Sequence, residues 1–311
     1  MIGNRLRVGA RASNLSQRQT RIVIDLLTDA YPGIGVEIVQ ISTIGDRQLE
    51  TPLPLMAGKG VFTEEIETAL LDGSIDFAVH SLKDLPVVSR TGIVIGAVPE
   101  RAAVEDMLIS RSGSSLSQLP HGTRIGTSSL RRSAQLLRFR QDLVTCSIRG
   151  NVETRIRKAL AETGQYDAIV LARAGLARLD LTDIAAEQLP LELMLPAPGQ
   201  GALAVQCRDD AGSRDFLRAI NHSETECTTA AERAFLSGLG GGCSTPVAAH
   251  GTIEGGALNL RGRVIATDGS RQIDVESTGQ GLDLQTAIDR GICLAENALA
   301  LGAADLLGDH E

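Results

Sequence analysis

Basic side chains are concentrated in one stretch of this 311-residue chain. Residues 124–158 hold nine basic side chains and two acids, a local charge of +7 in a protein whose net charge is -8. Eight of the nine are arginines, and a guanidinium binds a carboxylate or a phosphate through two parallel hydrogen bonds. This uneven distribution predicts a local site for a small anion. A solvated helix face is the simpler alternative.

Three segments carry polar side chains where a predicted strand gives way to a predicted helix. Ligands of such sheets bind beyond the carboxyl ends of the strands, where backbone amides at a helix start attract anions. The first segment, GARAS, supplies Arg11 and Ser13. The other two, GTSSLRR and IRGNVETR, supply Thr127, Ser128, Ser129, Arg131, Arg132, Arg149, Gly150 and Arg155. Because the arginines are spread over separate junctions, an anion site is favoured over a single solvated face.

The segment HSLKDLP (80–86) brings a carboxylate to the end of another predicted strand. Beside arginines, Asp84 would stay ionised and could stabilise a developing cation or move a proton. Lys83 and Asp84 could equally form a surface pair, which contributes at most about 1 kcal/mol. His80, next to an apolar strand, is more typical of a hydrogen-bonded core residue than of a catalytic base.

The segment GLGGGCSTPV (238–247) surrounds Cys243 with glycines. Glycine leaves room for a second molecule to approach the sulfur, so we predict an accessible, functional thiol. The other cysteines are expected to fill space, and Cys146 and Cys293 are typical of core residues. Five cysteines without a CxxC pair favour neither a disulfide framework nor a zinc site, so no metal is expected.

Composition excludes several classes of protein. With 43% hydrophobic and 22% charged residues, the chain is expected to be globular. Its acidic net charge and its 2% aromatic content disfavour binding to nucleic acid or to an anionic membrane. The first residues lack the apolar core of a signal peptide, and no stretch approaches the about 20 apolar residues of a spanning helix. We therefore expect a cytoplasmic protein.

The predicted elements alternate between strands and helices, which indicates an α/β fold. Apolar strands are expected at 6–10, 36–41, 76–80, 123–127, 143–148 and 166–172. A helix is expected from Phe62 to Leu71, and the prolines and glycines before residue 203 suggest a crossover back to the first sheet. We expect three domains: domain 1 over 1–99 with 199–219, domain 2 over 103–195, and a smaller α+β domain 3 over 221–311.

Five segments together resemble one known family, the porphobilinogen deaminases, also called hydroxymethylbilane synthases. In chain order the segments are HSLKDLP, GTSSLRR, IRGNVETR, LPAPGQGA and GGGCSTPV. They span all three expected domains. The resemblance implies an α/β fold with two periplasmic-binding-protein-like domains, a cleft between them and a smaller C-terminal α+β domain.

The resemblance also implies a transferase of tetrapyrrole (porphyrin and heme) biosynthesis. Such an enzyme joins four porphobilinogen molecules head to tail, loses ammonia at each step, and releases hydroxymethylbilane by hydrolysis. Its primer would be a dipyrromethane cofactor, bound through a thioether to Cys243. The implied partner is porphobilinogen alone, without nucleic acid or membrane. A monomer is expected because no long apolar face is evident.

The resemblance assigns roles residue by residue. Asp84 matches the catalytic aspartate of the family. The cofactor would be bound by Cys243, Lys83, Asp84, Thr127, Ser128, Ser129, Arg131, Arg132, Gly150 and Arg155. Incoming substrate would be bound by Arg11, Ser13, Gln19, Phe62, Arg149, Arg155 and Arg178. The 42–60 loop, which ends near Lys59, matches a loop thought to cover the cleft, although Leu55 and Met56 stand where relatives often carry a second lysine.

Two other functions are compatible with parts of the sequence. The paired α/β domains would suit a bilobal binding protein of the periplasmic type, which the missing signal peptide and the GGGC segment disfavour. A cysteine hydrolase would pair Cys243 with His80, His222 or His250. Domain motion at hinges near Pro99 and Pro198 would explain how one cleft accommodates a product that lengthens.

Overall fold

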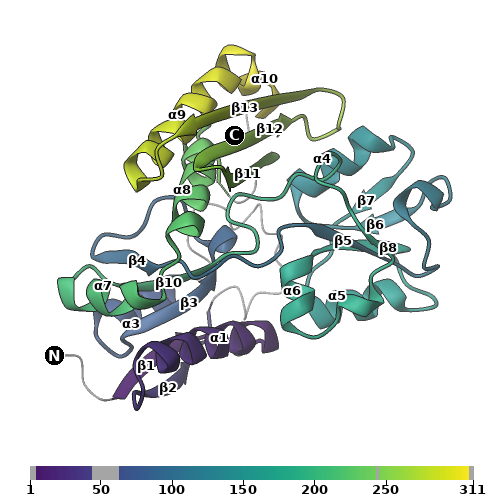
Figure 1. The fold of residues 1–311 in the computed structure, drawn as a ribbon. Helices are drawn as coiled ribbons and strands as arrows, with labels where there is room; N and C mark the ends of the chain where they lie inside the picture. The colour runs from purple at the N-terminus through teal and green to yellow at the C-terminus, as the bar shows by residue number, and fades with distance from the viewer. Residues whose placement is uncertain (1–4, 44–62, 243–244, 308–311) are drawn as a thin grey trace. The chain divides into compact units, whose positions relative to one another are not determined.

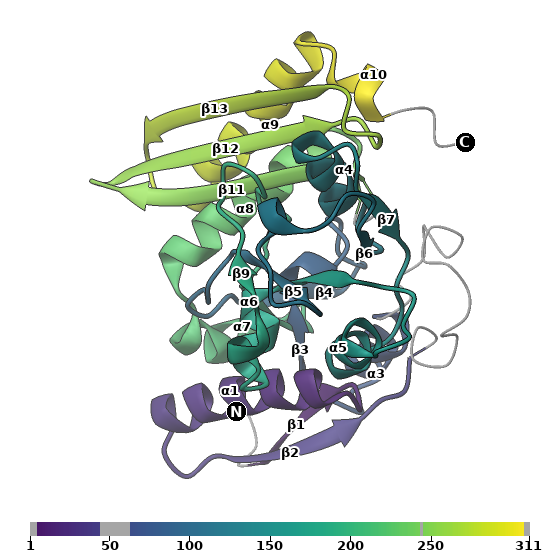
Figure 2. The same ribbon diagram turned by 90° about the vertical axis from the view of Figure 1, so that its right-hand side faces the viewer.

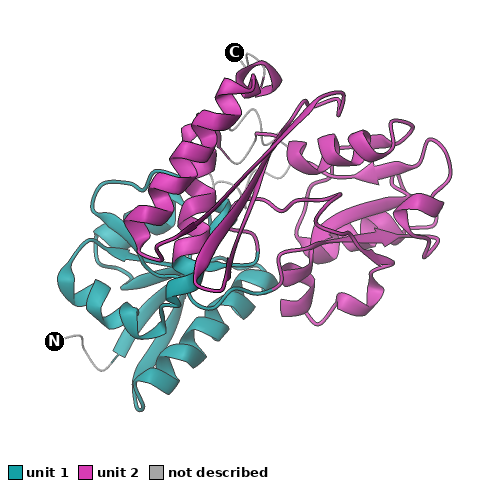
Figure 3. Cartoon of the chain, turned by 45° about the horizontal axis from the view of Figure 1, so that its top comes forward, with its two compact units in different colours: residues 1–102, 201–226 teal, residues 103–200, 227–311 magenta. Residues whose placement is uncertain are grey.

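The computed structural model describes residues 5–43, 63–242 and 245–307. Its ribbon is shown in Figure 1. The chain divides into two compact units, which are coloured separately in Figure 3. Unit 1 comprises Met1–Ala102 and Gly201–Glu226, and unit 2 comprises Ala103–Gln200 and Cys227–Glu311. Each unit is an α/β structure, and unit 2 contains two separate sheets.

Unit 1 is built on a five-stranded sheet in the order β2-β1-β3-β10-β4. The strands are β1 (Arg5–Ala10), β2 (Gly35–Gln40), β3 (Phe77–Ser81), β4 (Ile93–Ala97) and β10 (Leu203–Arg208). β1 is parallel to β2 and β3, whereas β10 is antiparallel to its neighbours β3 and β4. The expected return of the chain to the first sheet is therefore made by β10.

The helices of unit 1 pack on this sheet through apolar faces. They are α1 (Asn14–Ala30), α3 (Glu64–Leu71) and α7 (Ala211–Leu217), with short 3-10 turns η2 (Leu82–Asp84) and η5 (Arg218–Ile220). Val23, Ile24 and Leu27 of α1 are buried against the strands, at the spacing of one helix face. Helix α3 begins two residues later than the sequence predicts, and Phe62 lies outside the described residues.

The first sheet of unit 2 has the order β7-β6-β8-β5-β9. Its strands are β5 (Asp106–Ser110), β6 (Arg124–Gly126), β7 (Val144–Cys146), β8 (Ala168–Ala172) and β9 (Glu187–Gln188). Around them lie α4 (Leu130–Phe139), α5 (Val152–Leu160), α6 (Arg173–Arg178), η3 (Leu116–Gln118) and η4 (Thr182–Ile184). The strand expected at 143–148 is shorter, because its last residues already belong to the loop before α5.

The second sheet of unit 2 is an antiparallel meander of β11 (Val247–Glu254), β12 (Ala257–Ile265) and β13 (Gln272–Gln280), which lie side by side in Figure 2. Its helices are α8 (Ser223–Gly238), α9 (Leu284–Ala300) and α10 (Ala303–Leu307). Phe235 of α8 fills the space left by Gly262 on β12, where a Cβ would lie 2.5 Å from the ring. Buried Glu232 accepts hydrogen bonds from the amides of Gly199 and Gly251, both at 2.7 Å. The three-domain division remains a prediction.

Candidate active site

In unit 1, two sequence-predicted segments lie at the carboxyl ends of neighbouring parallel strands. β1 leads into Arg11 and Ser13, and β3 leads into the turn η2 with Lys83 and Asp84. Ser13 caps α1, because its hydroxyl accepts a hydrogen bond from the Ser16 amide at 3.3 Å. The topology therefore brings these four side chains to one edge of the sheet.

The turn that carries Asp84 is held by the leucines on either side of it. Leu82 and Leu85 are both buried, and the Leu82 amide donates to the Ala202 carbonyl of the chain segment that enters β10. Asp84 between them is exposed. A buried-exposed-buried turn thus directs one carboxylate outward from a fixed backbone.

Gln19 supports this turn from the neighbouring helix. Its side-chain amide donates to the Ser81 hydroxyl at 2.7 Å, and Gln19 is only 4% exposed. The contact joins α1 to the end of β3, two residues before Lys83. The substrate contact that the sequence implies for Gln19 remains a prediction.

Two of the histidines considered for a cysteine hydrolase have other environments. Burial lowers the pKa of His80 to about 4, and the charge of nearby Arg11 adds to this effect. His80 is therefore neutral at physiological pH. The Nδ1 atom of His222 lies 2.8 Å from the Thr225 hydroxyl.

In unit 2, three adjacent parallel strands each lead into a helix at the same edge of the sheet. β7, β6 and β8 precede α5, α4 and α6, so the loops after these strands are neighbours. The Ser128 hydroxyl joins two of the loops, because it donates to the Ile148 carbonyl at 2.8 Å and accepts from the Ile148 amide at 3.0 Å. Ser129 caps α4 by accepting from the Arg132 amide at 3.4 Å.

The loop before α5 depends on a glycine. Gly150 has a φ of +121°, and a Cβ there would lie 2.7 Å from the Thr154 methyl group. Asn151 caps α5 by accepting from the Thr154 amide at 2.8 Å. Arg155 donates from Nε to the Gly150 carbonyl at 2.7 Å, which orients its guanidinium over the loop. Arg149 in this loop is half-buried.

The two arginines of α4 meet at a buried carboxylate. Nη2 of Arg131 lies 2.8 Å from Asp106 Oδ2, and Nη2 of Arg132 lies 2.7 Å from Asp106 Oδ1. Gln200 also donates to Asp106 Oδ1, at 3.0 Å. The sequence analysis identified the arginines but missed Asp106 and Gln200. A glutamine between two glycines in the LPAPGQGA segment was the available signal for Gln200.

Arg178 ends the third helix of this edge, α6. Burial lowers its pKa to about 10, so the guanidinium still carries its charge at neutral pH. Arg149 in the loop before α5 and Arg155 in the first turn of α5 give the edge two cations besides the Arg131–Arg132 pair. Such an edge suits a ligand with several carboxylates.

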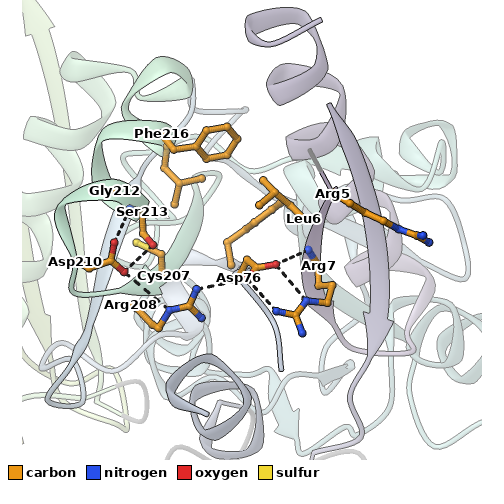
Figure 4. A pocket seen from close by; sticks show the side chains of 12 residues that line it. Arg5, Leu6, Arg7, Asp76, Cys207, Arg208, Asp210, Gly212, Ser213 and Phe216 are labelled. Carbon is orange, nitrogen blue, oxygen red and sulfur yellow. Dashed lines mark hydrogen bonds and ion pairs between the residues drawn. The ribbon is translucent and has the colours of Figure 1, made fainter. Parts of the chain in front are cut away.

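A cavity of about 580 Å³ lies at the opposite edge of the unit 1 sheet, at the amino-terminal ends of β1 and β3 (Figure 4). Arg7 and Arg208 line it, and both are paired with Asp76, at 3.1 and 3.4 Å. Its arginines are thus already engaged with an acid, and none of the sequence-predicted site residues lines it.

Three predicted site residues, Lys59, Phe62 and Cys243, lie outside the described residues. Among the other cysteines, Cys207 and Cys227 are buried as expected. The expectation that Cys293 is a core residue is wrong, because the buried face of α9 is formed by Gly291, Leu294 and Ala298 and leaves Cys293 exposed. None of the described helices has the length and apolar character that crossing a bilayer requires.

Comparisons with known proteins cover nearly the whole chain. The family model "Porphobilinogen deaminase, dipyromethane cofactor binding domain" matches residues 6–214, and "Porphobilinogen deaminase, C-terminal domain" matches residues 225–300. A curated porphobilinogen deaminase of Geobacter sulfurreducens is 46% identical over 307 residues, which cover 98% of this chain and 95% of the relative. One of Listeria monocytogenes is 45% identical over 304 residues, covering 96% of each chain.

Solved structures resemble the chain only distantly. The methionine binding protein MetQ has a TM-score of 0.45 at 16% identity, covering 70% of this chain and 90% of that one. A nutrient binding protein from Burkholderia cenocepacia bound to methionine has a TM-score of 0.43 at 15% identity, covering 71% and 93%. Because these TM-scores are below 0.5, we describe the fold from its own sheet topology and not from these structures.

Proposed function

The chain belongs to the porphobilinogen deaminase family, and on that premise we propose that it is a transferase that joins four porphobilinogen molecules head to tail and releases hydroxymethylbilane. Ammonia leaves at each joining step, and hydrolysis frees the product. The main support within the structure is the row of arginines at the carboxyl edge of the unit 2 sheet.

The residues at this edge suit the dipyrromethane cofactor that the family model names. Each pyrrole unit carries an acetate and a propionate, so the bound chain needs several cations. Arg131 and Arg132 share a single carboxylate. Arg149 lies in the loop before α5, Arg155 in α5, and Arg178 at the end of α6. Each charged hydrogen bond to a ligand carboxylate contributes roughly 1.5–3 kcal/mol.

We assign the binding roles as follows. The dipyrromethane, bound through Cys243, supplies the free pyrrole α-carbon at which the next unit is joined. Its carboxylates would be held by Lys83, Thr127, Ser128, Ser129, Arg131, Arg132, Gly150 and Arg155. Incoming porphobilinogen would be held by Arg11, Ser13, Gln19, Phe62, Arg149, Arg155 and Arg178. Holding both partners fixes their relative orientation and lowers the entropic part of the barrier.

Asp84 is assigned the catalytic role. As ammonia leaves the aminomethyl group of porphobilinogen, positive charge develops on the ring nitrogen of that substrate. A carboxylate that accepts a hydrogen bond from this N–H stabilises the charge where it forms. The same carboxylate can accept the proton lost from the α-carbon at the new bond and, once protonated, donate it to the departing amine of the next unit. Its outward direction from the rigid η2 turn suits this role.

Intact-protein mass spectrometry after denaturation tests the proposal. We expect the purified protein to carry the added mass of one dipyrromethane, and Cys243→Ser to lack it. Cys293→Ser is the matched control, because this exposed cysteine should leave the added mass unchanged. An unmodified mass in active wild-type protein would exclude the thioether.

We further propose that the protein acts in the cytoplasm as a monomer on a small-molecule substrate, with neither nucleic acid nor membrane as a partner. The acidic net charge of -8 supports the absence of nucleic acid. Light scattering coupled to size-exclusion chromatography would report the mass in solution, and a mass of twice 32.8 kDa would contradict the monomer.

A further inference from the structure

Asp106 is the centre of a buried polar cluster in unit 2. Its side chain is 0% exposed, and those of Arg131 and Arg132 are 4% and 9% exposed. Each carboxylate oxygen accepts a hydrogen bond from one guanidinium, and Oδ1 accepts another from the side-chain amide of Gln200. Asp106 is the first residue of β5 and pairs with Ala172, the last residue of β8, at the carboxyl end of that strand.

Each guanidinium is held at a second point by a backbone carbonyl. Nη1 of Arg131 donates to Leu195 O at 2.6 Å, and Nη1 of Arg132 donates to Val170 O at 3.1 Å. Two fixed points define the direction of a planar fork. Removal of Asp106 would leave each fork with one of these two anchors.

The cluster is not electrically balanced. Two guanidiniums share one carboxylate, and in the part of the chain that the structure describes no second acid pairs with either arginine. The Nε atoms of both arginines are buried, and within those same residues neither has a hydrogen-bond partner. Burial lowers the pKa of Arg131, which reflects the cost of holding this charge away from water. An anion bound nearby would offset that cost.

We propose that Asp106 is a positioning residue for the cofactor: it fixes Arg131 and Arg132 at the start of α4 and leaves one positive charge there for a carboxylate of the bound dipyrromethane. This inference rests on the proposed function. Asp106 itself does not touch the ligand. Its role is to orient two cations and to set how much charge they offer.

Asp106→Asn tests the inference, because asparagine keeps the shape and removes the charge. The measured quantity is the fraction of soluble, folded protein that carries the added dipyrromethane mass. We expect this fraction to fall at least about 5-fold, because misoriented arginines hold the cofactor carboxylates poorly. Full loading of a folded Asp106→Asn protein would overturn the proposal.

Asp76→Asn is the matched control. Asp76 is also one carboxylate shared by two arginines, but it lies in unit 1, at the amino-terminal end of β3. If Asp106 had a purely structural role, Asp106→Asn and Asp76→Asn would both be less stable, and the fraction of folded protein carrying dipyrromethane would be normal in both. Loss of loading in Asp76→Asn to the same extent would also contradict the proposal.

A double variant keeps the test decisive if Asp106→Asn fails to fold. Asp106→Asn/Arg132→Gln removes one cation together with the carboxylate and so restores the original excess charge. We expect the double variant to yield more soluble protein and a higher Tm than the single variant, a coupling that additive effects would not give. If the double variant has no higher Tm and no higher yield of soluble protein than Asp106→Asn, the inference that Asp106 balances one of the two arginine charges is contradicted. Wild-type protein without the added mass would instead refute the proposed function.

Discussion

The two units each contain one carboxylate shared by two arginines, and the surroundings of the two clusters differ. In unit 1, Asp76 pairs with Arg7 and Arg208, and its side chain is 21% exposed. In unit 2, Asp106 pairs with Arg131 and Arg132 and is fully buried. Arg208 of the first cluster also pairs with a second acid, Asp210, at 3.9 Å, and water screens these partly exposed charges. The second cluster is buried, and within the described residues its two arginines share Asp106 alone. The comparison shows that the number of ion pairs does not distinguish the two clusters, whereas their burial and charge balance do.

The same two clusters lie at opposite edges of their sheets. Asp76 precedes β3 and lines a cavity at the amino-terminal ends of the strands. The arginines that bind Asp106 begin the helix after β6, at a carboxyl end. Ligands of open α/β sheets bind at the carboxyl ends. Stability is therefore expected to depend on both clusters, and activity on the second alone.

Asp106→Asn should have the largest effect on stability. Breaking a buried ion pair from one side leaves uncompensated charge and costs about 3–5 kcal/mol. Chemical denaturation of the purified variant measures this loss. If the free energy of unfolding of Asp106→Asn falls by less than about 1 kcal/mol, the buried and the partly exposed cluster contribute equally to stability, which contradicts the comparison.

Asp84→Asn should separate catalysis from stability at the carboxyl edge of unit 1. We expect kcat to fall on the order of 100-fold, because proton transfer and charge stabilisation are lost. The Tm should be unchanged, because Asp84 is exposed and the turn is held by its leucines. Steady-state kinetics on protein of verified cofactor content is the measurement, and near-normal kcat would contradict the catalytic assignment.

Asp76→Asn should give the reverse result at the other edge. Because its ion pairs are partly exposed, we expect a loss of about 1 kcal/mol in the free energy of unfolding and an unchanged kcat. Glu37→Gln is a suitable control, since the Arg5–Glu37 pair is exposed on both sides and should contribute almost nothing. A several-fold drop in the kcat of Asp76→Asn would show that the amino-terminal edge takes part in function.

The smallest effect should be a difference in acid sensitivity. Burial alone would raise the pKa of Asp76, but hydrogen bonds from Arg7 and Arg208 outweigh it and hold that pKa below its ordinary value of 3.8. A carboxylate whose pKa is lower in the folded protein than in the unfolded chain stabilises the fold at every pH above its unfolded-state pKa. This stabilisation is lost as the pH falls through the folded-state pKa. Unfolding measured between about pH 5 and pH 3 should show a shallower decline in Asp76→Asn than in wild type. Identical slopes would exclude the contribution of this pair.

Much of the site was predictable from local sequence. Helix starts at Ser13, Ser129 and Asn151 follow from capping chemistry, and the motifs identified the family that the family models confirm. Short-range patterns suffice for these features because the partners are three residues apart.

The long-range features were not predictable. Asp106 starts a strand that the sequence analysis did not identify, and its arginine partners lie 25 and 26 positions further along the chain. Gln19 acts through Ser81, 62 positions away. A count of charges along the chain includes the arginines of the 124–158 stretch but omits Asp106, which balances half of the Arg131–Arg132 pair.

The antiparallel strand β10 has a consequence for how the chain is made. The ribosome delivers residues from the N-terminus, yet β10 lies between β3 and β4. The first sheet therefore cannot be completed until residue 208 has been synthesised, after the whole first sheet of unit 2. Until then β3 and β4 expose unpaired edges, which are prone to aggregation. The turn that carries Asp84, fastened by the Leu82–Ala202 hydrogen bond, acquires its final backbone only at that late stage of synthesis.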